Sequence, residues 1–251
     1  MMKRHPVASA IAGILLLALL GIGGWWVYGR LFRTYAVTRR FHAGEQWRYQ
    51  VTQSLQVGQQ SITLNLFYTE TVKEANSDGT ALVERVLHGD AQTLHALQQS
   101  AAPLGEIPKR TVWRVHPDGR ETPLSRKQAH LSLGSAGARL YPLHPVRIGE
   151  QWERESEMGS IRSRFLCRLE GIIELEGNPC YKIVARLESL PGSLPQVRGT
   201  LTSYIDRQSG WVRQEEGTIT MTAGSLQMSS QIRIHGQPVH EGTNRRGARN
   251  G

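Results

Sequence analysis

The chain has 251 residues, and 39% of them are hydrophobic, which is enough for an ordinary buried core and excludes a disordered protein. The formal net charge is +9, but the charge is unevenly placed. Residues 1–40 hold six basic residues and no acidic ones, and residues 236–251 hold three basic residues and one acidic residue. The middle of the chain is nearly neutral, so a nucleic-acid-binding domain is not expected.

An uncharged segment, VASAIAGILLLALLGIGGWWVY, occupies residues 7–28 after a basic start. As a helix it would span about 33 Å, close to the hydrocarbon thickness of a bilayer. Trp25, Trp26 and Tyr28 stand at its end, where aromatic residues meet the membrane interface. The segment predicts a transmembrane helix in contact with membrane lipid, with the bulk of the chain exported. A cleaved signal peptide is the alternative, although no Ala-x-Ala site follows.

The arginines that follow this segment, Arg30, Arg33, Arg39 and Arg40, are expected to be solvated or to contact anionic lipid. Residues 1–40 are therefore interpreted as a membrane anchor with a basic juxtamembrane segment.

Alternation of apolar and polar residues then dominates and predicts antiparallel strands. The stretch GEQW opens the first of them at residues 44–47 and recurs at residues 149–152. Residues 89–108 lose the alternation and are expected to form a short helix or an ordered loop, and residues 125–146 are expected to form a linker that ends in two prolines. From residue 236 the tail shows no apolar periodicity and is expected to be disordered. The predicted strands cover residues 47–57, 62–68, 80–87, 111–124, 165–173 and 181–187, with further strands around residue 210 and after residue 225.

Two cysteines occur in the second half of the chain. If the hairpin between the two strands around them is centred on Gly177 with a loop of odd length, Cys167 lies opposite Leu187 and Cys180 lies opposite Glu174. The two cysteines would then be roughly 23 Å apart along the strand, too far for a disulfide. Cys167 is expected to act as a small core residue.

Three features recur in the same order in both halves: GEQW, a turn glycine followed by a strand, and an aromatic strand that ends at a glycine. Their separations are 105, 98 and 91 residues. This pattern predicts one unit that has been duplicated, with residues 41–124 as the first copy and residues 147–235 as the second.

In each copy of GEQW the residues have structural interpretations. Gly44 and Gly149 permit unusual backbone angles where the strand begins, and Trp47 and Trp152 are expected to be buried at equivalent places. The glutamate is expected to cap exposed amide groups, because no partner for a catalytic carboxylate lies at short spacing. The fold expected is mainly β, with two related antiparallel units whose curved sheets form half-barrels or one barrel-like sheet after an N-terminal transmembrane helix.

Three stretches of the second unit, YPLHPVRIGEQW, CRLEGIIELEGNPCYKIVARLE and GTLTSYIDRQSGWVRQ, resemble bacterial cell-envelope proteins of unknown function that are built from duplicated antiparallel β units. Members of that family often begin each unit with Pro-Val-x-x-Gly-Glu/Asp-x-Trp. The resemblance covers roughly residues 41–222 and implies an inner-membrane protein with its β region in the periplasm or outside the cell. It supplies no catalytic residues. The chain is similar, more distantly, to periplasmic half-barrel carriers of lipoproteins and lipids.

The sequence lacks the common local motifs of catalytic and metal-binding sites. The nine histidines are scattered without zinc-site spacing, and no Gly-x-Ser-x-Gly elbow or phosphate-binding glycine loop occurs. We therefore expect no catalytic residues, no cofactor and no metal. An acidic cluster, formed by Glu150, Glu153, Glu155 and Glu157, is interpreted as a solvated strand face, with a cation or a basic partner as the alternative.

The sequence thus favours a membrane-anchored, non-catalytic protein that binds a hydrophobic, lipid-like ligand or an envelope partner. Two alternatives stay open. One is a scaffold or sensor domain for protein–protein interaction, and the other is a hydrolase whose site is assembled from distant positions.

Overall fold

The computed structural model describes residues 33–89, 108–124, 140–158 and 161–239. Within them the chain is almost entirely strand and turn. The strands are β1 (Thr34–Tyr35), β2 (Gln46–Val57), β3 (Gln60–Ala75), β4 (Ala81–His88), β5 (Arg110–Val115), β6 (Glu121–Pro123), β7 (Val146–Arg147), β8 (Gln151–Met158), β9 (Ile161–Leu175), β10 (Asn178–Ser189), β11 (Gln196–Asp206), β12 (Val212–Ala223) and β13 (Leu226–Pro238).

Eleven of these strands form one continuous antiparallel sheet in the order β6-β5-β4-β3-β2-β13-β12-β11-β10-β9-β8. Each half of the chain is therefore a meander, and the halves are joined where the first long strand, β2, pairs with the last, β13. The remaining two strands, β1 and β7, form a separate small pair. Of the two arrangements that the sequence left open, half-barrels or one barrel-like sheet, the structure has the single curved sheet.

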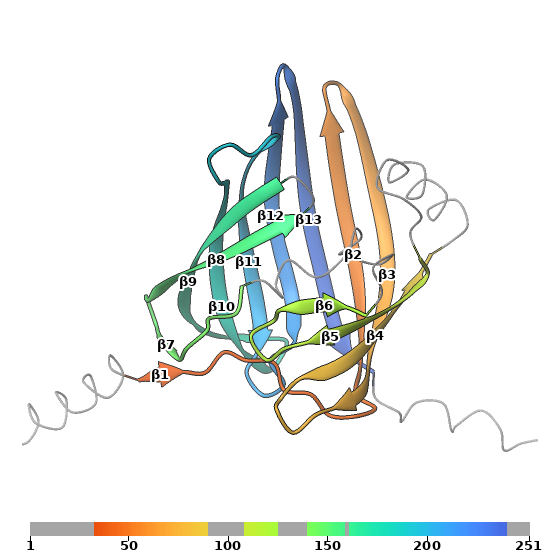
Figure 1. The fold of residues 1–251 in the computed structure, drawn as a ribbon, viewed down its shortest axis with the longest axis vertical. Helices are drawn as coiled ribbons and strands as arrows, with labels where there is room; N and C mark the ends of the chain where they lie inside the picture. Colours follow the sequence, from red (N-terminus) through yellow and green to blue (C-terminus); the bar gives the residue numbers. More distant parts are fainter. Residues whose placement is uncertain (1–32, 90–107, 125–139, 159–160, 240–251) are drawn as a thin grey trace, which may run out of the picture.

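The sheet curls so that its outer strands turn toward one side of the long central strands (Figure 1). Strands β11 and β12 approach closely at Gly217, where a Cβ atom would lie only 2.3 Å from the carbonyl oxygen of Thr200. The curl brings the two ends of the sheet into contact. On the edge strand β8, Arg154 donates a hydrogen bond of 3.4 Å to the carbonyl oxygen of Asp118 in the β5–β6 turn.

The two GEQW stretches begin their strands through the same backbone hydrogen bonds. The N–H of Gly44 donates to the Val72 carbonyl oxygen at 2.8 Å, and the N–H of Gly149 donates to the Leu169 carbonyl oxygen at 2.7 Å. Both glycines have positive φ, 84° and 87°, which favours glycine at these positions. The similarity is local, and the division into two repeated units stays a prediction.

The glutamates of the two stretches bond to nearby N–H groups. In the second copy Glu150 accepts a hydrogen bond of 2.8 Å from the backbone N–H of Arg147, as the amide-capping interpretation expected. In the first copy Glu45 accepts a bond of 3.0 Å from the indole N–H of Trp47 and a longer one, 3.4 Å, from the backbone N–H of His42. These contacts give both carboxylates a structural role.

The core fills one end of the curled sheet, here called the base. Its largest side chains are aromatic: Trp47 stacks on Trp211 with ring centroids 5.6 Å apart, and Tyr49 stacks on Tyr68 at 4.8 Å. The segment before β2 crosses this end (Figure 1) and ties the two halves together. There the backbone N–H of Arg39 donates to the carbonyl oxygen of Pro117, and the backbone N–H of Arg40 donates to the carbonyl oxygen of Ser209.

This placement corrects the interpretation of residues 33–40 as a juxtamembrane segment. Tyr35, Val37 and Arg39 are all buried, and they belong to the folded base. The sequence suggested otherwise because a run of arginines beside an apolar segment is typical of a membrane flank, whereas the acidic partner of Arg39 lies far away along the chain. The expected transmembrane helix itself lies outside the described residues, and within the described residues no helix is long and apolar enough to cross a membrane.

Two further expectations need correction. The tail was expected from residue 236, but β13 continues to Pro238, which pairs with Trp47. The β9–β10 loop is even, with two central residues, Glu176 and Gly177, both at positive φ. A bulge in β9 opposite Lys182 and Ile183 then shifts the register by one residue, so Phe165, Cys167 and Leu169 lie on the same face as Leu187, Ala185 and Ile183.

As a result of this register, the residues opposite the cysteines differ from those expected. Cys167 lies opposite Ala185, and Cys180 lies opposite Ile173. The two thiols are free and buried. Along β10 the distance from Cys180 to Ala185 is roughly 17 Å. The cysteines thus remain on the same pair of strands but too far apart for a bridge.

The predicted helix or loop at residues 89–108 and most of the predicted linker at residues 125–146 lie outside the described residues. The described end of the linker, residues 140–146, is ordered against the base, where Leu140 and Tyr141 are fully buried.

Candidate ligand-binding site

The long hairpins β2–β3 and β12–β13 extend beyond the base at one end of the molecule (Figure 1). We call the face of these strands that continues the core face the inner wall. By the strand register its members beyond the base share this face, and most are apolar. They are Val51, Gln53, Leu55, Ile62, Leu64, Leu66, Gly217, Ile219, Met221, Leu226, Met228, Ser230 and Ile232.

The inner wall becomes less covered toward the tips of the hairpins. Leu64 and Leu66 are buried, Leu55, Ile219 and Ile232 are half-buried and pack against the core, and the residues nearest the tips, Ile62 and Leu226, are 54% and 50% exposed. Alternation therefore continues the apolar face of the core along the hairpins to their exposed tips. An apolar surface of this kind is typical of a place where a ligand or partner binds.

The inner wall carries no charged side chain beyond the base. Its polar contact is a hydrogen bond of 3.1 Å from the side-chain amide of Gln53 to the hydroxyl of Ser230, on neighbouring strands. The nearest acidic group, Glu215, is buried at the level of the base and accepts a hydrogen bond of 2.5 Å from Ser203. The wall thus suits an uncharged, mainly apolar molecule.

A buried ionic network, formed by Arg39, Glu70, Arg85 and Glu121, closes the base beneath the wall. Glu70 accepts a hydrogen bond of 3.0 Å from Arg39 and one of 2.9 Å from the Nε of Arg85. Glu121 accepts a further bond of 3.2 Å from Arg85. With two guanidinium groups and two carboxylates, the network is neutral overall, as a stable buried network requires.

The protonation states within the base follow from these neighbours. Burial alone would raise the pKa of Glu70, but Arg85 and Arg39 hold it below its ordinary value. Burial raises the pKa of Tyr68 and of Tyr141 well above the usual range for a phenol. The guanidinium of Arg39 also lies 4.2 Å from the centre of the Trp211 ring. The base therefore holds ionised Arg–Glu pairs beside neutral tyrosines.

The described residues offer little nucleophilic or metal chemistry. Burial raises the pKa of the Cys167 thiol to about 12 and that of the Cys180 thiol to about 11, which keeps both protonated near neutral pH. Three of the described histidines contact a glutamate or threonine side chain: His42 contacts Glu45, His144 contacts Glu150 and His88 contacts Thr69. Among the described residues no group of three or more potential metal ligands is found.

The structure places the residues singled out by the sequence as follows. Trp47 is buried in the base, and Trp152 is buried on β8, where its indole N–H donates to the Leu140 carbonyl oxygen at 3.0 Å. The predicted interface residues Trp25, Trp26 and Tyr28 lie outside the described part of the chain.

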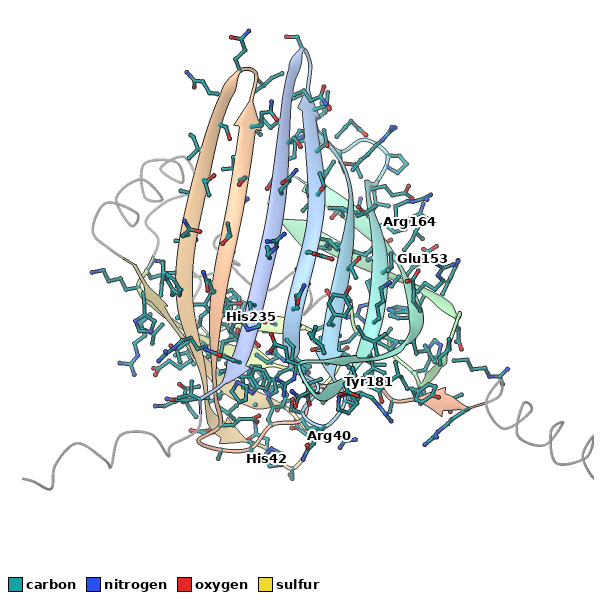
Figure 2. The ribbon with its side chains drawn as sticks, turned by 180° about the vertical axis from the view of Figure 1, so that it is seen from behind. Arg40, His42, Glu153, Arg164, Tyr181 and His235 are labelled. Atoms are coloured by element: carbon teal, nitrogen blue, oxygen red, sulfur yellow. The ribbon has the colours of Figure 1, made fainter. Side chains whose placement is uncertain are left out.

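The acidic cluster is dispersed. While Glu150 caps the turn before β8, Glu153 lies within 3.6 Å of Arg164 on the neighbouring strand (Figure 2). Glu155 is exposed on the same strand. None of these sequence-predicted positions lies on the inner wall.

Sequence reasoning missed the inner wall as a site although it found the strands that form it. The signal was present in the apolar alternation of residues 55–66 and 219–232, but alternation alone does not show where a core ends. The ionic network left no local signal, because its four members come from separate parts of the chain.

No protein-family model and no curated protein matches the sequence. Among solved structures the chain is similar to lipovitellin, with a TM-score of 0.45 and 8% identity over 79% of this chain and 25% of that one, so it spans about a quarter of lipovitellin's length. It is also similar to a DUF1329 family protein from Desulfovibrio piger, with a TM-score of 0.23 and 10% identity over 80% and 87% of the two chains. A LolA superfamily protein from Nitrosomonas europaea gives a TM-score of 0.20 and 10% identity over 80% and 89%.

Proposed function

We propose that this chain is a membrane-anchored protein of the bacterial cell envelope that binds a lipid-like ligand along the inner wall and catalyses no reaction. The observation that carries the proposal is the continuation of the apolar core face along the hairpins, from the half-buried Val51 and Ile232 to the exposed Ile62 and Leu226. On the opposite face of the same strands the residues at equal height are polar, such as Thr63 and Gln56. The apolar character therefore belongs to one face and not to the hairpins as a whole.

Burial of such a wall by a ligand is favourable because apolar surface leaves water, at about 25 cal/mol per Å². The stretch of β2 from Val51 to its end is roughly 20 Å long, which gives an extended apolar chain a continuous track. The Gln53–Ser230 pair lies within this track and offers a polar group of the ligand one place to bond.

The proposed location rests on the sequence. The uncharged segment at residues 7–28 supplies the anchor, and residue 33, where the described chain begins, lies at the base end of the sheet (Figure 1). The open ends of the hairpins then lie away from the side on which the chain leaves the membrane. In this arrangement the wall faces the periplasm.

The test is to purify the full-length protein, extract it with organic solvent and identify the released molecules by mass spectrometry. We expect stoichiometric lipid from the wild type and at least fivefold less from Leu55→Glu, because a carboxylate on the wall must lose its hydration when an apolar chain binds. Gln56→Glu is the matched control, since it places the same group on the next residue but on the opposite face, and it should retain the lipid. Wild-type protein that carries no lipid, or equal loss in both variants, would contradict the proposal.

A further inference from the structure

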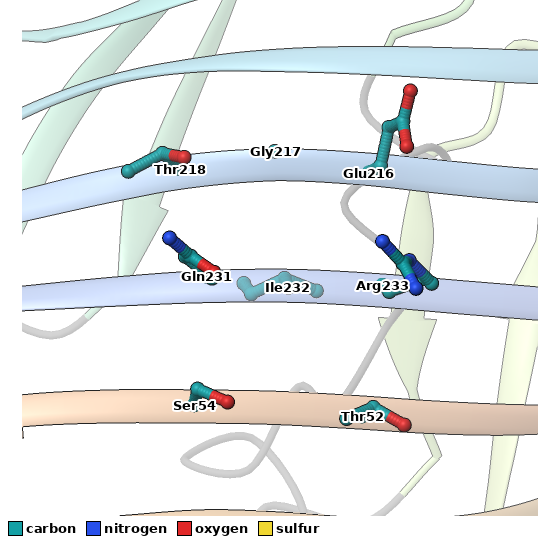
Figure 3. Close-up of a pocket in the computed structure, with 8 residues that line it drawn as sticks. All are labelled: Thr52, Ser54, Glu216, Gly217, Thr218, Gln231, Ile232 and Arg233. Carbon is teal, nitrogen blue, oxygen red and sulfur yellow. The ribbon is translucent and has the colours of Figure 1, made fainter. Parts of the chain in front are cut away.

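The outer face of the sheet, opposite to the inner wall, carries a groove (Figure 3), and the two share Gly217 and Ile232 in their lining. The volume of the groove is about 410 Å³, within the range of small-molecule sites. The groove crosses three adjacent strands, and its side chains alternate with those of the inner wall. The polar residues that line it are Thr52 and Ser54 on β2, Glu216 and Thr218 on β12, and Gln231 and Arg233 on β13.

The strand register arranges these six residues in two parallel rows. In one row Glu216 lies opposite Arg233, and Arg233 lies opposite Thr52. The second row, at the other end of the groove, contains Thr218, Gln231 and Ser54 in the same order (Figure 3). Each row thus presents hydrogen-bond donors and acceptors side by side, on strands whose backbone is held by the sheet.

Much of this bonding capacity is unused. Thr52 donates to Asn65 at 3.0 Å, and the hydroxyl of Ser54 is 3.2 Å from that of Thr63. In the described part of the chain the side chains of the other four lining residues, Glu216, Thr218, Gln231 and Arg233, form no hydrogen bond or ion pair. This holds even for Glu216 and Arg233, which face each other across neighbouring strands.

The chemistry of the groove selects among ligand classes. It holds one carboxylate and one guanidinium, so it has no net charge to attract an anion or a cation. Its apolar lining residue, Ile232, belongs to the inner face, so the groove offers little to a lipid. Planar amide, carboxylate and guanidinium groups beside hydroxyls are suited to the neighbouring hydroxyls of a sugar, each of which is both donor and acceptor.

An exposed aromatic ring lies on the next row of the same face. Phe67 is 40% exposed and lies opposite Gln50, which in turn lies opposite His235, a residue on the outer side of β13 (Figure 2). An apolar ring beside polar groups gives the face of a sugar ring a surface to pack against. We propose that this outer groove binds a neutral oligosaccharide. The inference is independent of lipid binding on the inner wall, and either site stands if the other fails.

The test is calorimetric titration of the full-length protein, held in a detergent without a sugar head group, with four neutral trisaccharides: maltotriose, cellotriose, mannotriose and fully N-acetylated chitotriose. We expect saturable binding of at least one at millimolar concentration or below. Arg233→Ala should weaken that binding about tenfold, because one charge-assisted hydrogen-bonding group is lost. The matched control, Arg186→Ala, removes an exposed arginine from β10 and should change the affinity less than about twofold.

A second variant tests whether the ligand that binds in the groove is neutral or charged. Glu216→Gln removes the charge but keeps a planar bonding group, so the affinity should stay within about threefold, and it should be the same at about 0.05 M and 0.5 M NaCl. Three results would overturn the inference: no binding of any trisaccharide at about 10 mM, binding that Arg233→Ala leaves intact, or loss of binding in Glu216→Gln.

Discussion

At the scale of single residues, Glu70 connects the two buried arginines of the ionic network in the base. Its carboxylate is 1% exposed and accepts hydrogen bonds from both Arg39 and Arg85. Arg39 in turn packs on Trp211 and so holds the segment before β2 against the sheet. Removal of this one charge leaves two buried guanidinium groups with Glu121 as the remaining carboxylate of the network.

We therefore expect Glu70→Gln to lower the free energy of unfolding by about 3–5 kcal/mol, the usual cost of breaking a buried ion pair from one side. Urea denaturation followed by circular dichroism measures the change. Glu74→Gln, an exposed position on the same strand, serves as control and should shift the free energy by no more than about 0.5 kcal/mol. Equal effects of the two substitutions would show that the network does not stabilise the fold.

Glu70 also makes the free energy of unfolding depend on pH, and the sign of this dependence follows from the direction of its pKa shift. The pKa of Glu70 is lower in the folded chain than its ordinary value of 4.5, so ionised Glu70 stabilises the fold above about pH 4.5. This contribution is lost as the pH falls below that value through the folded pKa. The stability gap between wild type and Glu70→Gln should thus stay constant above about pH 5 and narrow as the pH falls below about 4.5, and a gap that does not narrow in acid would contradict the assignment.

At the scale of elements, the β9–β10 hairpin shows what sequence patterns decide and what they leave open. The apolar alternation located both strands and the turn, but not the register. A two-residue turn followed by a bulge gives the same face pattern as an odd loop without one, because the bulge adds the residue that the turn omits. The strand pairing and the backbone φ angles of Glu176 and Gly177, 51° and 75°, separate the two solutions.

Those angles lead to a stabilising substitution. A glutamate at positive φ is strained, whereas Asn-Gly is the preferred pair for a two-residue turn of this kind. Glu176→Asn should raise the free energy of unfolding by about 0.5–1 kcal/mol, measured by thermal or urea denaturation. Glu174→Asn, within the strand of the same hairpin, should give no gain. If Glu176→Asn destabilises the protein, the turn is not of this type.

For the candidate site too, the sequence predicted one part and left another part open. The strands of the inner wall were predictable, since residues 47–57 and 62–68 alternate clearly. The exposure of the wall could not be predicted, because it depends on how far the neighbouring strands reach. Ile62 is exposed because β4 pairs with β3 only from Phe67 onward. The same limit applies to Arg39, whose burial follows from Glu70 on β3, Glu121 on β6 and Trp211 just before β12 rather than from its local sequence.

At the scale of the whole molecule, one sheet carries two faces of different chemistry. The long hairpins present apolar side chains inward and hydroxyl, amide and few charged groups outward, and the network around Glu70 closes the base. The pairing of β2 with β13 is what places the two hairpins side by side, since each comes from a different half of the chain. The inner wall thus exists only in the complete sheet.

The central claim, that the inner wall holds a lipid-like ligand, is tested most directly by photo-crosslinking. The full-length protein is loaded with a fatty acid that carries a diazirine on its chain, irradiated and digested, and the labelled residues are located by mass spectrometry. The account predicts labels on inner-wall residues such as Leu55, Ile219 and Met221, and far fewer on outer residues of the same strands such as Gln56 and Thr220. Labels spread equally over both faces, or absent from the wall, would contradict it.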